Sequence, residues 1–261
     1  MQSTSKKQNN HFPILILIGR PACGKSEIID YLQHIDINKR VARFHIKNIQ
    51  VLDDFPMLWT WFEEDDILED KFHKERLYTD SLGYFKHDYL WDLLIQRLEL
   101  EYQKKLKDNP WYDEGNTTII EFSRGSQHGG YAQALTNFSE DLLNKASILY
   151  VNVSYRESQR KNRLRFNPQR PYSILEHALP DEKLEKLYSS DDWHKLTASD
   201  KHFLVTGSCR TPYAVFENED DITTGDSSAL GSRLEQALNH LWDIHQMRSS
   251  SFSDNKPVKE G

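Results

Sequence analysis

A glycine-rich segment near the start of the chain contains the residue types that bind phosphate. The segment GRPACGKS, residues 19–26, fits the pattern G-x-x-x-x-G-K-[ST] and follows the apolar run ILILI. Glycines let a loop curl so that its N–H groups face a phosphate, and the helix that follows adds its positive end. The lysine reaches the β- and γ-phosphates, and the serine hydroxyl is a ligand for Mg²⁺. We therefore predict a site for ATP and Mg²⁺ that is formed by Gly19, Arg20, Pro21, Ala22, Cys23, Gly24, Lys25, Ser26 and Glu27.

Two carboxylates follow other β-type runs. Asp53 lies in IQVLDDF, and Glu121 lies in NTTIIEF. We call residues 19–26 the phosphate loop. A carboxylate that faces this loop accepts the proton of an acceptor hydroxyl while that oxygen attacks the γ-phosphate. We assign this role and substrate contact to Asp53, and we assign Mg²⁺ binding to Ser26 and Glu121. The alternatives are a helix cap or solvated turn for Asp53, and a salt bridge to Arg124 for Glu121.

Arginines follow the later β-type runs. Arg124 lies in the glycine-rich segment RGSQHGG, where it could bind a substrate anion. Arg156, Arg160 and Arg163 are spaced by four and three residues, which is the spacing of one helix face. We predict that these arginines form a lid in which Arg156 contacts the nucleotide. Arg160 and Arg163 of the lid are predicted to be catalytic residues, together with Lys25 and Asp53. A solvated basic helix face is the alternative.

The elements around these residues must bring them together. We expect strands over 13–18, 41–46, 117–122 and 147–153, and helices over 25–35, 84–106, 130–145, 155–166 and 230–242. Segment 201–217 fits either a hairpin or a single strand. Alternating strands and helices imply parallel strands with ligands at their carboxyl ends. The predicted class is therefore α/β, a P-loop NTPase fold of three layers (α/β/α) with a mostly parallel central sheet and a helical lid and acceptor region.

Composition limits the organisation of the chain. The chain has 261 residues, of which 38% are hydrophobic, enough to fill one large domain. Residues 1–11 and 248–261 are polar, so we expect disordered tails around a domain over 12–247. Within it, we expect residues 55–110 to form a helical insertion that binds the acceptor and residues 155–190 to form the arginine-rich lid.

Charge and cysteine content narrow the partners. The formal net charge of -7 argues against binding to a nucleic-acid polymer, so the expected partner is a small molecule. Two cysteines do not form a disulfide framework, which fits a cytoplasmic location. The apolar stretch 12–18 is too short to cross a membrane, and the oligomeric state is left open.

The order of these segments resembles the P-loop nucleoside and nucleotide kinases, especially the uridine kinase and nicotinamide riboside kinase group. The resemblance covers roughly residues 12–245 and depends on GRPACGKS, DDF, IIEF and VFENEDD. It implies that Asp53 is the catalytic aspartate, that Glu121 lies near Mg²⁺, and that Asn218 contacts the base. Phe122 replaces the glycine that follows the glutamate in that group.

These residues predict an ATP- and Mg²⁺-dependent kinase for a nucleoside-like or other small hydroxylated acceptor. A nucleoside monophosphate kinase, in which Arg124 binds the acceptor phosphate, is the first alternative. A regulatory protein that binds ATP without an acceptor is the second.

Overall fold

The computed structural model describes residues 10–165, 169, 178–225 and 227–253. Six strands form one sheet in the order β2-β3-β1-β4-β6-β5. The strands are β1 (Ile14–Gly19), β2 (Asn48–Asp53), β3 (Asn116–Phe122), β4 (Ala146–Asn152), β5 (Phe203–Thr206) and β6 (Cys209–Glu217). All neighbouring strands are parallel except β5 and β6, which form an antiparallel hairpin.

The two faces of the sheet have separate hydrophobic cores. Successive side chains of a strand point to opposite faces, so Ile14, Ile16 and Ile18 of β1 join one core whereas Leu15 and Leu17 join the other. Every residue of β1 is buried. A strand buried on both faces has the continuous apolar sequence that ILILI shows.

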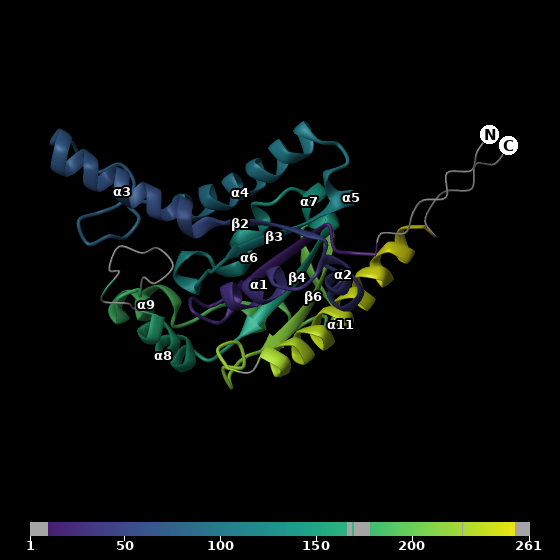
Figure 1. Ribbon diagram of the computed structural model, residues 1–261. Coiled ribbons are helices and arrows are strands. Elements are labelled where there is room, and N and C mark those ends of the chain that lie inside the picture. Colours follow the sequence, from purple (N-terminus) through teal and green to yellow (C-terminus); the bar gives the residue numbers. More distant parts are fainter. Residues whose placement is uncertain (1–9, 166–168, 170–177, 226, 254–261) are drawn as a thin grey trace.

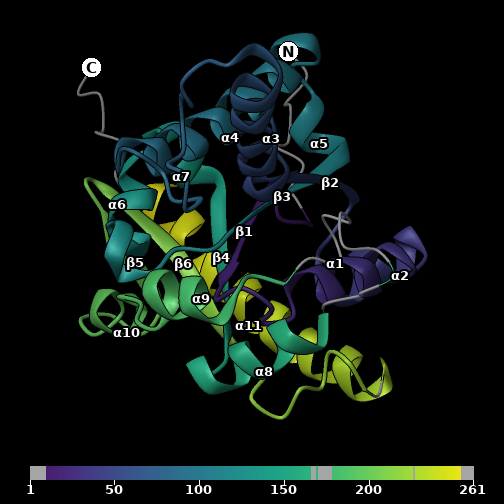
Figure 2. The same ribbon diagram turned by 90° about the vertical axis from the view of Figure 1, so that its left-hand side faces the viewer.

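Helices cover both faces and the carboxyl edge of the sheet (Figures 1 and 2). One face packs against α1 (Lys25–Gln33), α2 (Ile37–Phe44) and α11 (Ser227–Ser253). The other packs against α4 (Tyr89–Asp108), α5 (Tyr112–Gly115), α6 (Gly130–Thr136), α7 (Glu140–Lys145) and α10 (Trp193–Leu196). Beyond the carboxyl ends of the strands lie α3 (Asp54–Phe72), α8 (Tyr155–Arg165) and α9 (Asp181–Tyr188). This architecture confirms the predicted three-layer α/β/α class.

The predicted strand over 41–46 is wrong, because this segment ends helix α2 and the second strand is β2. Asp36 caps the start of α2 by accepting hydrogen bonds from the backbone N–H groups of Asn38 and Lys39. Arg40 anchors the helix by donating to the carbonyl oxygens of Leu32, Ile35 and Lys47. These contacts outweigh the β-type pattern of VARFHI.

One predicted helix is divided, and one open alternative is decided. The helix expected over 130–145 is broken into α6 and α7, because the hydroxyl of Ser139 accepts a hydrogen bond from Leu142 N–H and starts a new helix. Segment 201–217 is a hairpin of β5 and β6.

The predicted tails are shorter than expected. His11 is buried and hydrogen-bonds through Nε2 to the carbonyl oxygen of Asp113. Helix α11 continues to Ser253, and Arg248 is buried and donates to the carbonyl oxygens of Leu143 and Ala146. The remaining tail residues, 1–9 and 254–261, lie outside the described residues, as does most of segment 166–177 in the predicted lid.

Within the described ranges, none of the helices has both the length and the apolar character needed to cross a membrane.

Helix α9 packs closely on the loop that follows β3. A Cβ atom added at Gly125 would lie 1.8 Å from the carbonyl oxygen of Leu187 in α9. The φ of -106° at Gly125 suits any residue, so only space restricts this position. We expect Gly125→Ala to lower the free energy of unfolding by about 1–3 kcal/mol in urea denaturation, because the two backbones must separate.

Gly115→Ala is the matched control, since nothing lies within 4 Å of a Cβ added there. Equal losses in the two variants would contradict the close packing of α9.

Candidate functional site

The phosphate loop connects β1 to α1, as predicted. Gly24 precedes the helix with a left-handed φ of 109°, and a Cβ added there would lie 2.6 Å from the side-chain nitrogen of Asn218. Glycine is therefore required by both conformation and space. Because Gly24 has no side chain to cap α1, the first N–H groups of the helix are available to an anion.

Lys25 lies across the loop. Its Nζ atom donates to Ser123 Oγ at 2.9 Å and to the carbonyl oxygen of Arg20 at 3.2 Å. The same atom is 3.9 Å from Oε1 of Glu121. The ammonium group therefore lies between the loop and the end of β3, where its charge faces the predicted acid.

Asp53 and Glu121 lie side by side at the carboxyl edge of the sheet. They are partners in the register of β2 and β3, and Glu121 is also opposite Leu17 of β1. Asp53 accepts a hydrogen bond from Phe55 N–H at 3.0 Å and caps α3, which was the alternative to a catalytic role. The cap uses one carboxylate oxygen, Oδ1, and the side chain still lines the same cavity as Lys25.

Burial and mutual repulsion disfavour ionisation of these acids. Burial, with the charges of Glu121 and Asp54, raises the pKa of Asp53 to about 7. Burial also raises the pKa of Glu121, although Lys25 opposes the shift. A carboxyl group with a pKa near neutrality is suited to accept a proton.

One cavity of about 570 Å³ extends from the phosphate loop to α3 and to the segment 83–91. The loop, Asp53, Glu121 and Ser123 line one part of it. Aromatic side chains line the remainder, namely Phe55, Trp59, Phe62, Tyr84, Phe85, Trp91 and Tyr188. Helix α9 contacts the segment 83–84 at this end of the cavity. Lys183 donates to the carbonyl oxygen of Gly83, and Lys186 lies over the ring of Tyr84.

Arg124 lines the cavity but is buried and already paired with an acid. It is 2% exposed, and its Nη1 atom is 2.6 Å from Oδ2 of Asp54. It also donates to the carbonyl oxygen of Trp91 and lies over the ring of that residue. Arg124, the predicted substrate arginine, therefore connects the end of β3 to α3 and α4. It forms its salt bridge with Asp54 and not with Glu121, which was the alternative considered from the sequence.

The predicted lid arginines lie on the face of α8 that points away from the cavity. Arg156 is exposed, Arg160 pairs with Glu157 and Asp221, and Arg163 pairs with Asp181. The inner face instead carries Ser158, Asn162 and Arg165. Arg165 Nη2 is 3.3 Å from Ser26 Oγ, so this arginine approaches the phosphate loop. Helical spacing puts positions 158, 162 and 165 on the face opposite Arg156, Arg160 and Arg163, but spacing alone does not tell which of the two faces meets the loop.

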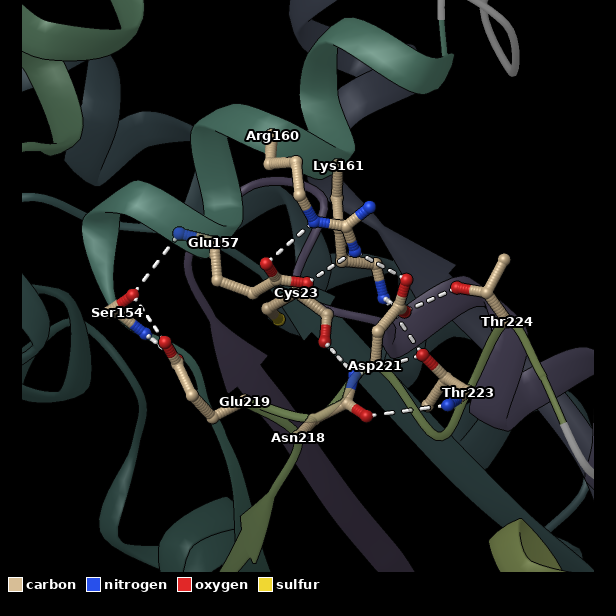
Figure 3. Close-up of polar contacts among 10 residues, drawn as sticks. All are labelled: Cys23, Ser154, Glu157, Arg160, Lys161, Asn218, Glu219, Asp221, Thr223 and Thr224. Carbon is tan, nitrogen blue, oxygen red and sulfur yellow. Dashed lines mark hydrogen bonds and ion pairs between the residues drawn. The ribbon is translucent and has the colours of Figure 1, made fainter.

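Figure 3 shows how the segment after β6 supports the loop. Asn218 is fully buried, and its Nδ2 atom donates to the carbonyl oxygen of Cys23 at 2.7 Å and to Thr223 Oγ1 at 2.9 Å. Asp221 accepts from Arg160 and Lys161 of α8. Asn218 therefore holds the backbone of the phosphate loop instead of facing a base.

The remaining loop residues have different environments. Arg20 points away and pairs with Asp191 at 2.7 Å, while the carbonyl oxygen of Pro21 accepts from Ser158. Burial raises the pKa of the Cys23 thiol. Oε2 of Glu27 is buried and accepts no hydrogen bond from the described residues.

The buried pair of Arg124 and Asp54 gives a stability prediction. Arg124→Ala leaves the Asp54 charge buried without its partner and should lower the free energy of unfolding by about 3–5 kcal/mol in urea denaturation. Arg163→Ala breaks an ion pair whose arginine is 60% exposed, so it should change the midpoint little. Similar losses in the two variants would contradict the structural role of Arg124.

The raised pKa of Asp53 predicts how stability depends on pH. The stabilising contribution of its protonated form is complete below about pH 4, the ordinary range of the group, and is lost as pH rises through about 7. Asp53→Asn keeps the capping oxygen and removes the charge. Thermal denaturation without nucleotide should therefore show Asp53→Asn more stable than the unsubstituted protein at pH 8 and similar at pH 4.

Asp70→Asn, on an exposed part of α3, is the control and should give no such crossover. An Asp53→Asn protein that is less stable at pH 8 would refute the raised pKa.

Comparison with known proteins finds distant structural likenesses. No protein-family model matches the sequence, and the search of curated proteins gives no match. The crystal structure of APE1195 is 15% identical, with 88% of this chain and 98% of that chain covered and a TM-score of 0.37. Kti12 from Chaetomium thermophilum, in complex with ADP-AlF3, is 12% identical, with 89% and 98% covered and a TM-score of 0.43. Likenesses of this extent leave the function to be inferred from the chain's own residues.

Proposed function

We propose that the protein is an ATP- and Mg²⁺-dependent phosphotransferase whose acceptor is a small hydroxylated molecule with a nucleoside-like ring. The observation that carries the proposal is that the phosphate loop, Asp53 and a group of aromatic side chains line the same cavity. We call the part of the cavity lined by Phe55, Trp59, Phe62, Tyr84, Phe85, Trp91 and Tyr188 the aromatic chamber. A transfer reaction needs such a space, because the donor phosphate and the acceptor must lie next to each other with water excluded.

The loop half of the cavity fits a nucleoside triphosphate with Mg²⁺. Lys25 supplies the cation for the outer phosphates. Arg165 brings a second positive charge to the loop, where it contacts the hydroxyl of Ser26. Ser26 and Glu121 offer the oxygen ligands that Mg²⁺ prefers, and two protein ligands are sufficient because phosphate and water oxygens complete its shell. Bound Mg²⁺ would neutralise charge on the transferring phosphoryl group.

The position of Asp53 and its raised pKa support a role as general base. It lies between the phosphate loop and the aromatic chamber, and its pKa of about 7 lets it hold an acceptor proton near neutrality. In this proposal, Asp53 accepts the hydroxyl proton while the acceptor oxygen attacks the γ-phosphate.

The aromatic half favours an acceptor with a planar ring and no phosphate. The half-buried rings of Phe55 and Trp59 provide stacking surfaces, whereas Trp91 and Tyr188 are buried and pack the wall. Arg124 was the residue that favoured a monophosphate acceptor, and its charge is already paired with Asp54. The resemblance to the nucleoside kinases also supports an uncharged hydroxylated acceptor.

The test is ADP release from ATP and Mg²⁺ with a panel of nucleosides, nucleoside monophosphates, ribosides and sugars. We expect release to depend on one uncharged class and to vanish in Lys25→Ala. Asp53→Asn should lower the rate by about 10²- to 10⁴-fold with ATP affinity retained, because only the proton acceptor is lost.

Tight ATP binding without acceptor-dependent ADP release would contradict the proposal and favour the regulatory alternative. An unchanged rate in Asp53→Asn would exclude Asp53 as the base. Release that depends on monophosphates alone would favour the nucleotide kinase.

A further inference from the structure

Ser123 is a polar residue of the cavity to which the sequence assigned no role. It directly follows β3, two positions after Glu121, and its side chain lines the cavity with those of Lys25 and Asp53. Its hydroxyl oxygen accepts a hydrogen bond from Lys25 Nζ at 2.9 Å. A phosphate oxygen that binds Lys25 at this place therefore lies within reach of the Ser123 hydroxyl.

The backbone of Ser123 is held firmly. Its carbonyl oxygen accepts from Arg124 Nη1 at 2.7 Å, and that same Nη1 atom pairs with Asp54. The preceding residue, Phe122, is in register with Ile18 in the sheet. Rotation of the hydroxyl is therefore the main freedom of this residue, which is the condition for a preorganised contact.

The position of Ser123 selects the outermost phosphate. The loop backbone holds the inner phosphates. Ser123 instead directly follows β3, which lies between β2, the strand that ends at Asp53, and β1, the strand that precedes the loop. When Lys25 moves from the loop carbonyl oxygens to a phosphate, the hydroxyl of Ser123 can turn and donate its proton to the same phosphate. A hydroxyl is suited to this exchange because it both accepts and donates.

We propose that Ser123 donates a hydrogen bond to the γ-phosphate and so distinguishes ATP from ADP. This inference rests on the nucleotide half of the proposed function and does not require an acceptor. The hydroxyl is a specificity residue, and it acts together with Lys25.

The experiment measures the affinities of the Ser123→Ala protein for Mg²⁺-ADP and for the Mg²⁺ complex of the β,γ-imido analogue of ATP by calorimetry. We expect the affinity for the analogue to fall about 10- to 100-fold, the range for a hydrogen bond to a charged group. The affinity for ADP should stay at its original value.

Three variants serve as controls. Ser123→Thr keeps the hydroxyl and should keep the preference for the triphosphate. Ser123→Cys keeps the size but has a weak donor, so it should lose the preference even if Ser123→Ala folds poorly. Ser126→Ala changes an exposed hydroxyl of the same loop and should have no effect.

Equal changes in both affinities, or none in either, would overturn the proposal, since Ser123 would then act only on Lys25 or on folding. Failure of every acceptor in the transfer assay would leave this binding result intact. Absence of nucleotide binding by the unsubstituted protein would reject both proposals.

Discussion

Parallel pairing of β3 with both β1 and β2 is the constraint on which the site depends. The register places Glu121 beside Leu17 and Asp53, so the ends of three strands meet at one edge of the sheet. Each strand contributes one component there, namely the phosphate loop, the acid Asp53 and the segment from Glu121 to Arg124. The apolar cores on the two faces fix this register, because a slip of one residue would turn every buried side chain of a strand to the other face.

Convergence of these strands also concentrates charge in a partly buried place. Asp53, Asp54 and Glu121 lie together, and their repulsion adds to the cost of burial. Lys25 and Arg124 offset the negative charge of these acids, but only one of the two cations can exchange its partners for a ligand. Arg124 is fixed by Asp54 and Trp91, whereas Lys25 is held by loop carbonyl oxygens and Ser123 and can exchange these for a phosphate. The same edge therefore combines a rigid cation that holds the walls with a cation suited to bind ligand.

Sequence alone predicted the parts of the site that depend on local context. The phosphate loop follows from its own glycines and from the apolar strand before it, and the parallel sheet follows from the alternation of elements. Asp53 and Glu121 could be placed together because the carboxyl ends of parallel strands share an edge. The segment VARFHI has a β-type pattern but forms a helix, because Asp36 caps its start and Arg40 donates to carbonyl oxygens outside the segment.

Other features depend on contacts between distant segments. The partner of Arg124 is Asp54, 70 positions away, and Asn218 holds Cys23 across 195 positions. For α8, helical spacing correctly grouped Arg156, Arg160 and Arg163, but only the fold shows which face of the helix meets the loop. Ser123 had no sequence signal beyond its position after a strand.

The central claim is that the cavity transfers the γ-phosphoryl group to a second molecule, and the most direct measurement is the fate of that group. Phosphorus NMR of a reaction with ATP, Mg²⁺ and the acceptor panel follows it without an assumption about the product. The account predicts a new phosphate-ester signal that grows as the γ-phosphate signal of ATP declines, and that is absent with Lys25→Ala. Conversion of ATP to inorganic phosphate alone, with or without acceptors, would contradict it.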